Sequence, residues 1–224
     1  MEIIQDRAAS SGPAQSVVVL LPGAYMRAQD FAAHGFIDAV RRTGQPIDIV
    51  AADTGMECYL DGSIVERLHA EVVSPQLATG TRRIWLAGIS LGGLGALLYT
   101  QAHPDLVEGL LLMSPFIGTR GAVAEVLKAG GFRDWQPSAG DAATGEQRLL
   151  QWLKTYRADA SKSPHIYLGY GSDDRFAASY RLLAELLPVE NVVAISGGHD
   201  WETWQVLWAQ LLSKTKFATE PQAS

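Results

Sequence analysis

The chain has 224 residues, 47% of them hydrophobic, and a formal net charge of −6 at pH 7. This length is enough for one substantial core, so we predict a single domain over residues 1–224. The acidic balance excludes the basic surface that nucleic acids and acidic membranes attract. No apolar run reaches the ~18 residues of a membrane span, and no secretory signal is visible, so we expect a cytoplasmic protein without a membrane partner.

The metal-binding and redox classes find no support in the sequence. Its five histidines do not cluster at the spacing of metal ligands, so we expect no metal and no cofactor. Cys58 is the one cysteine, which excludes an internal disulfide framework.

Strands and helices are predicted to alternate along the chain. Short, continuous apolar runs indicate strands that are buried on both faces, at 16–21, 47–52, 84–89, 107–113, 165–170 and 191–195. Apolar residues at helical spacing, bounded by glycine, proline or capping residues, predict helices at 30–42, 63–78, 176–187 and 201–212. A small-residue helix follows the third strand and ends at His103-Pro104.

This alternation predicts an α/β fold with a doubly wound, mostly parallel sheet and helices on both faces. Strand signals disappear over residues 117–162, which carry helical stretches near 123–128 and 146–156. The segment is too long for an ordinary connection, so we interpret it as a helical cap insertion, with a long surface excursion as the alternative. Residues 215–224 are polar and are expected to form a loose tail.

The most informative motif joins the strand at 84–89 to the helix that follows. Gly88-Ile89-Ser90-Leu91-Gly92 matches G-x-S-x-G, a sharp strand-to-helix turn that lifts a serine hydroxyl above the sheet edge. Glycines flank the serine because side chains there would strike the neighbouring strand or helix. Ser90 is therefore the candidate nucleophile.

A serine nucleophile needs a histidine base, and that base needs an orienting carboxylate. In this kind of fold the chain order is serine, acid, histidine. The acid candidates are Asp173 and Asp174, which follow the strand at 165–170. The base candidate is His199, which follows the last strand after two glycines.

Stabilising a tetrahedral oxyanion requires two donors, usually backbone N–H groups. Leu91 at the start of a helix is expected to supply one. The second is expected from the loop after the first strong strand, where Pro22 has no N–H, which makes Ala24 the preferred donor and Tyr25 a weaker one.

These residues resemble the α/β-hydrolase superfamily over roughly residues 17–212. The resemblance is carried by Leu-Pro-Gly-Ala at 21–24, Gly-Ile-Ser-Leu-Gly-Gly at 88–93, Gly-Ser-Asp-Asp at 171–174 and Gly-Gly-His-Asp-Trp at 197–201. It implies Ser90 as nucleophile, His199 as base and Asp174 as acid, since similar enzymes place the acid three residues after a glycine. The chain departs from the family at Pro22-Gly23, where His-Gly is usual, and in a leading hairpin reduced to about residues 2–5.

The resemblance implies a small serine hydrolase that cleaves carboxylic esters of small acyl substrates and needs no cofactor. A thioesterase or acyltransferase, a cofactor-free perhydrolase or haloperoxidase, and a low-turnover ligand-binding protein remain alternatives, because one fold hosts many reactions. A monomer or homodimer is expected. The side chains that we expect to line an apolar substrate pocket are Tyr25, Met26, Phe116, Trp135 and Trp201.

Overall fold

The computed structural model describes residues 1–9, 14–137, 145–156 and 164–217. These residues form a seven-stranded sheet in the order β1-β3-β2-β4-β5-β6-β7. The strands are β1 Ile3–Asp6, β2 Ser16–Leu21, β3 Ile47–Ala52, β4 Arg83–Ile89, β5 Val107–Met113, β6 His165–Gly171 and β7 Val192–Ile195. Only β1 runs antiparallel to its neighbour among these strands, so the predicted mostly parallel sheet is confirmed.

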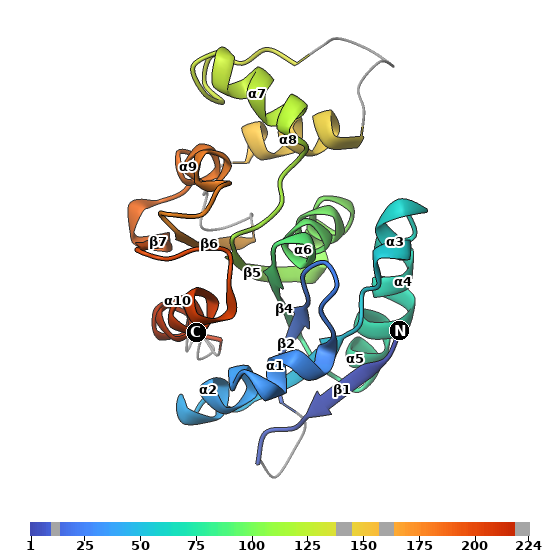
Figure 1. The fold of residues 1–224 in the computed structure, drawn as a ribbon. Coiled ribbons are helices and arrows are strands. Elements are labelled where there is room, and N and C mark those ends of the chain that lie inside the picture. The colour runs from blue at the N-terminus through green and yellow to red at the C-terminus, as the bar shows by residue number, and fades with distance from the viewer. Residues whose placement is uncertain (10–13, 138–144, 157–163, 218–224) are drawn as a thin grey trace, which may run out of the picture.

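Ten α-helices of the described residues connect and cover the strands (Figure 1). They are α1 Ala28–Ala33, α2 Phe36–Arg42, α3 Met56–Leu60, α4 Ile64–Leu68, α5 Ser74–Ala78, α6 Leu91–Ala102, α7 Arg120–Lys128, α8 Gly145–Thr155, α9 Ala177–Ala184 and α10 Trp201–Lys214. Two predicted helices are subdivided. The one over 30–42 breaks at Gly35, whose φ of 72° is left-handed, and the one over 63–78 contains a π-helical turn at His69–Val73.

Each face of the sheet carries its own hydrophobic cluster, because successive side chains of a strand point to opposite faces. Val17 and Val19 of β2 belong to the cluster beneath α4 and α6, which also includes buried residues of α7, α8 and α9. Val18 and Leu20 belong to the cluster beneath α1, α2 and α10. Helices therefore cover both faces, as expected for a doubly wound sheet.

The carboxyl ends of the central strands meet at one edge and are tied together there. The N–H of Ser90, after β4, donates to the carbonyl of Met113 on β5 at 3.0 Å. The N–H of Ser114, after β5, donates to Gly169 on β6 at 2.8 Å, and that of Ser172 donates to Ile195 on β7 at 2.7 Å. The loops that follow these strands are thereby held side by side.

Helices α7 and α8 lie together beyond α6 and α9 (Figure 1). They are the helical part of the predicted cap over 117–162, of which residues 138–144 and 157–162 lie outside the described residues. Leu149, Leu150 and Leu153 of α8 are buried in the same cluster as α6, so this helix is packed onto the main body.

The start of the predicted loose tail is packed. Phe217 is 1% exposed, its ring meets Trp85 edge to face, and its carbonyl accepts a hydrogen bond from the Ser16 hydroxyl at 2.6 Å. The prediction is therefore wrong for residues 215–217, and 218–224 lie outside the described residues. In the described part of the chain, no helix is both long and apolar enough to cross a membrane.

Candidate active site

Ser90 sits on a strained turn between β4 and α6. Its φ of 50° and ψ of −111° are unusual for a residue with a side chain, and such strain persists only where surrounding packing enforces it. Gly92 provides that packing: a Cβ there would lie 2.0 Å from the carbonyl oxygen of Leu21, so α6 meets the end of β2 at main-chain distance. The turn therefore holds the serine at the carboxyl edge of the sheet.

The structure brings Ser90, His199 and Asp174 together in one hydrogen-bonded chain. The Oγ of Ser90 lies 3.0 Å from Nε2 of His199, and Nδ1 of His199 lies 2.6 Å from Oδ2 of Asp174. The Asp174 side chain is fully buried, whereas that of His199 is 24% exposed. Since these residues follow three different strands, the contact depends on the tertiary fold.

The two acid candidates lie in different surroundings. Oδ1 of Asp174 accepts from the N–H of Phe176 at 2.9 Å, which fixes the carboxylate facing His199. Asp173 is exposed and accepts from the Ser196 hydroxyl and the Gly197 N–H, which both lower the pKa of its carboxyl group. Asp173 therefore fastens the loop that precedes His199, and Asp174 faces the imidazole itself.

The loop that carries His199 lies directly against the end of β6. A Cβ on Gly171 would stand 2.2 Å from the carbonyl oxygen of Gly197, so the two segments approach at main-chain distance. The His199 ring is flanked edge to face by Phe176 at 5.7 Å and by Trp204 at 5.0 Å between ring centroids. These contacts restrict the orientation of the imidazole.

Tyr180 on α9 is a further member of this cluster that the sequence did not reveal. Its hydroxyl donates to Oδ2 of Asp174 at 3.0 Å and lies 3.4 Å from Nδ1 of His199. Burial, and then the charge of Asp174, raise the pKa of Tyr180 well above its ordinary value, so the hydroxyl keeps its proton. A tyrosine at a buried helical position gives no sequence signal that separates it from core packing.

The segments that carry the two expected oxyanion donors adjoin Ser90. Leu91 is the first residue of α6, and the first N–H groups of a helix have no intrahelical acceptor. The loop after β2 turns tightly, with the N–H of Met26 donating to the carbonyl of Gly23 at 3.2 Å and a φ of 62° at Tyr25. A Cβ on Gly23 would lie 3.5 Å from Cβ of Ser90, so this turn, which includes Ala24, adjoins the serine.

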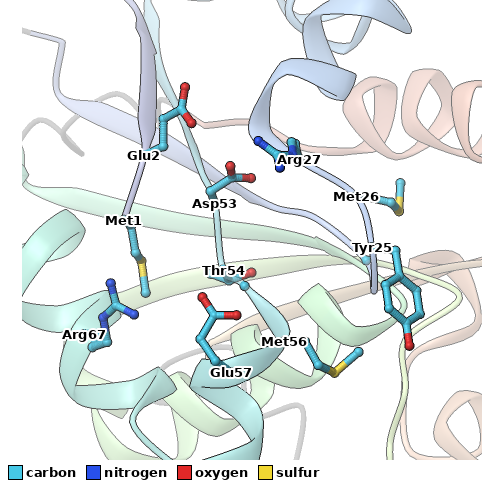
Figure 2. A pocket seen from close by; sticks show the side chains of 12 residues that line it. Met1, Glu2, Tyr25, Met26, Arg27, Asp53, Thr54, Met56, Glu57 and Arg67 are labelled. Atoms are coloured by element: carbon cyan, nitrogen blue, oxygen red, sulfur yellow. The ribbon is translucent and has the colours of Figure 1, made fainter.

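The expected pocket residues are divided between several places. Tyr25, which is 95% exposed, and Met26 lie at one end of a hollow of about 520 Å³, with Met1 and Arg67 at its other end (Figure 2). Phe116 lines a second hollow, of about 260 Å³, beside α7.

The other two expected pocket residues are packed among aromatic side chains. Trp135 is 3% exposed in the core and meets Phe132 edge to face. Trp201 stacks on His34 with 4.0 Å between ring centroids. Of the five expected pocket residues, Tyr25, Met26 and Phe116 therefore border the two hollows named above, and Trp135 and Trp201 do not.

Asp200, next to His199, caps α10. Its Oδ1 accepts from the N–H of Thr203 at 2.8 Å, and this contact lowers the pKa of its carboxyl group. We expect Asp200→Ala to lower the free energy of unfolding by about 1 kcal/mol at pH 7. Asp200→Asn should keep most of the stability of the wild type, because asparagine is an equally good cap. Urea unfolding of the three proteins measures this difference.

The direction of the pKa shift of Asp200 also predicts how the stability difference between wild type and Asp200→Ala depends on pH. Because folding lowers the pKa of Asp200, the charged cap stabilises the protein above the ordinary value of 3.8 and loses this effect as pH falls through the folded value. The gap between wild type and Asp200→Ala should therefore narrow below about pH 4. Equal destabilisation by alanine and asparagine would contradict the capping role.

Comparison with models of known protein families identifies the family of this chain. The model of the family described as "Putative esterase" matches residues 50–215, a span that holds Ser90, Asp174 and His199. The chain belongs to this esterase family. A search of the curated proteins found no match.

Solved structures with the same arrangement of strands and helices include several esterases and serine hydrolases. A ferulic acid esterase superposes with a TM-score of 0.61 at 18% identity, covering 96% of this chain and 97% of that one. S-formylglutathione hydrolase from Staphylococcus aureus gives 0.62 at 11% identity, covering 92% and 82%. The fluorophosphonate-binding serine hydrolase F of the same organism gives 0.59 at 12%, covering 92% and 84%. At these identities the likeness establishes the α/β-hydrolase fold.

Proposed function

We propose that the protein is a serine hydrolase that cleaves carboxylic ester bonds of small acyl substrates through a Ser90–His199–Asp174 triad. The observation that carries this proposal is the unbroken hydrogen-bonded chain from the Ser90 hydroxyl through the imidazole to a buried carboxylate. Membership of an esterase family supports the same chemistry. The printed names of the structural neighbours point to different substrates, so the substrate is argued below from this chain's own hollows.

The first half-reaction forms an acyl-enzyme. Oγ of Ser90 attacks the ester carbonyl carbon while Nε2 of His199 accepts its proton, and Asp174 stabilises the imidazolium through Nδ1. The N–H groups of Ala24 and Leu91 donate to the tetrahedral oxyanion, each stabilising it by about 3 kcal/mol. When the intermediate collapses, His199 donates the proton to the leaving alcohol.

The second half-reaction releases the acid. His199, now neutral again, accepts a proton from a water molecule that attacks the acyl carbonyl, and the same two N–H groups hold the second oxyanion. Collapse breaks the bond to Ser90 and returns the proton from His199 to Oγ. Asp174 keeps its contact with Nδ1 of His199 in both half-reactions, and no cofactor takes part in any step.

The test of this proposal is hydrolysis of 4-nitrophenyl acetate, butyrate, octanoate and palmitate by the purified protein. We expect saturable turnover that favours the short chains, because the two hollows that reach the neighbourhood of Ser90, through Phe116 and through Gly23, measure about 260 and 520 Å³. Rates equal to spontaneous hydrolysis for all four esters would reject the proposal.

Tyr180 provides a prediction for the pH dependence of this activity. Because its pKa is raised, the hydroxyl stays protonated and keeps donating to Asp174 at alkaline pH. We therefore expect ionisation of Tyr180 to cause no decline of kcat/KM near pH 10. Tyr180→Phe, which removes this hydrogen bond, should lower kcat several-fold, and by a similar factor at every pH.

The matched control is Tyr170→Phe, which removes a hydroxyl from the ring that packs against Tyr180 at 5.6 Å. Its activity should stay close to that of the wild type. If kcat/KM of the wild type declines near pH 10 and that of Tyr180→Phe does not, then Tyr180 ionises in this range, which would contradict the prediction.

A further inference from the structure

A hollow beside α7, called here the α7–α9 hollow, has the composition of a site for an apolar group that ends in an anion. It measures about 260 Å³ and lies between α7 and the segment 175–179 that leads into α9. Its large apolar lining residues are Phe116, Val123, Leu127 and Phe176, and its charged ones are Arg120 and Arg175.

Two residues that line the α7–α9 hollow contact residues of the candidate active site. The N–H of Phe116 donates to the carbonyl of Ser90 at 2.8 Å. The ring of Phe176 meets the His199 ring edge to face, with 5.7 Å between centroids. The α7–α9 hollow therefore adjoins the candidate active site through these two residues.

The charge of the α7–α9 hollow has a single sign. Two arginines and no carboxylate are among its lining residues, although the whole chain carries a net charge of −6. The Arg175 guanidinium lies over the Phe176 ring, 4.7 Å from its centroid, which places the cation at the apolar wall. The larger hollow in Figure 2 differs, because Asp53 and Glu57 line it together with arginines.

The carboxylate of Glu146, near this hollow, is bound by another residue. Glu146, next to the start of α7, accepts from the N–H and the hydroxyl of Thr119, at 3.1 and 2.8 Å. Within the described part of the chain, neither Arg120 nor Arg175 forms an ion pair with a carboxylate. Both guanidinium groups therefore retain donors for an anion from outside the protein.

We propose that the α7–α9 hollow selects ester substrates that carry a carboxylate a few atoms from the reacting carbonyl, on either the acyl or the alcohol group. The apolar lining takes the connecting carbons, and Arg120 and Arg175 hold the carboxylate at the mouth. This inference rests on the proposed esterase function and names its substrate class.

The experiment compares matched pairs of esters that differ in charge and hardly in shape. One pair is 4-nitrophenyl adipate and 4-nitrophenyl adipamate, with a carboxylate or a neutral amide at the end of the acyl chain. The other is the butyrate ester of 4-hydroxybenzoate and that of 4-hydroxybenzamide. The readout is the ratio of kcat/KM for the charged ester over its neutral partner.

We expect the wild type to favour the charged member of at least one pair by about tenfold, as a charge-assisted contact in a partly exposed site provides. Arg175→Gln and Arg120→Gln should each lower this ratio, and their double variant should bring it close to one. Sodium chloride at 0.5 M should also lower it. Arg181→Gln, which alters an exposed arginine on α9 away from the hollow, should leave it unchanged.

A ratio near one for both pairs in the wild type, with 4-nitrophenyl butyrate still hydrolysed, would overturn this inference and leave the proposed function standing. A preference that persists in the double variant would also overturn it, because the selectivity would then arise elsewhere. No hydrolysis of 4-nitrophenyl butyrate would reject the proposed function and this inference with it.

Discussion

Ser90→Ala is expected to lower kcat for 4-nitrophenyl butyrate by about 10⁴- to 10⁶-fold, because it removes the atom that forms the acyl-enzyme. The residual rate would come from the oxyanion donors and from substrate binding. Alanine keeps the Cβ and is the smallest change at a position with φ of 50°, so we expect the fold to survive. Stopped-flow and steady-state hydrolysis measure the loss, and circular dichroism checks the fold.

The matched control is Ser172→Ala. Ser172 follows β6 at the same edge of the sheet and is exposed, and its hydroxyl contacts Asp173 rather than His199. Its activity should remain within about twofold of the wild type, as for most surface substitutions. A folded Ser90→Ala protein that keeps the wild-type rate would show that another group is the nucleophile.

Asp174→Asn should lower kcat by about 10⁴-fold, whereas Asp173→Asn should change it only a few-fold. An asparagine at 174 loses the charge that stabilises the imidazolium, and its amide favours the wrong imidazole tautomer. Asparagine at 173 retains an oxygen that accepts from Ser196 and Gly197, so the loop before His199 stays fastened. The two variants differ by one position in the chain and remove the same charge.

The kcat values of both variants are compared by steady-state kinetics on 4-nitrophenyl butyrate. Urea unfolding checks that both variants remain stable. The reverse order, with Asp173→Asn the more damaged enzyme, would assign the acid to the exposed carboxylate. Equal losses in both would indicate that the loop geometry, and not the charge at Asp174, limits the rate.

The strands were the most predictable part of this fold. Strands buried on both faces are continuous apolar runs, and 16–21, 47–52 and 107–113 were predicted with the bounds that the structure gives them. Helices were predicted less well, because their breaks depend on main-chain geometry. Gly35 ends α1 through a left-handed conformation, and the π-helical turn at His69–Val73 has no sequence signature.

Long-range contacts explain what the sequence did not predict. Phe217 lies in a polar segment, and contacts with residues far away in the sequence hold it in place: its ring packs on Trp85, and its main chain is hydrogen-bonded to the side chains of Ser16 and Gln45. Asp173 and Asp174 are equivalent as residues after a strand, and their separation into an exposed and a buried carboxylate arises from the loop that carries His199. The contact of Tyr180 with Asp174 likewise depends on how α9 packs.

The central claim, that Ser90 is an activated nucleophile, is tested most directly by covalent labelling. The native protein is treated with a fluorophosphonate, and its intact mass and peptide map are measured beside those of Ser90→Ala and of heat-unfolded protein. The account predicts one adduct per chain, located on Ser90, and none in the other two samples. A folded wild-type protein that remains unlabelled, or that carries the adduct on a different serine, would contradict it.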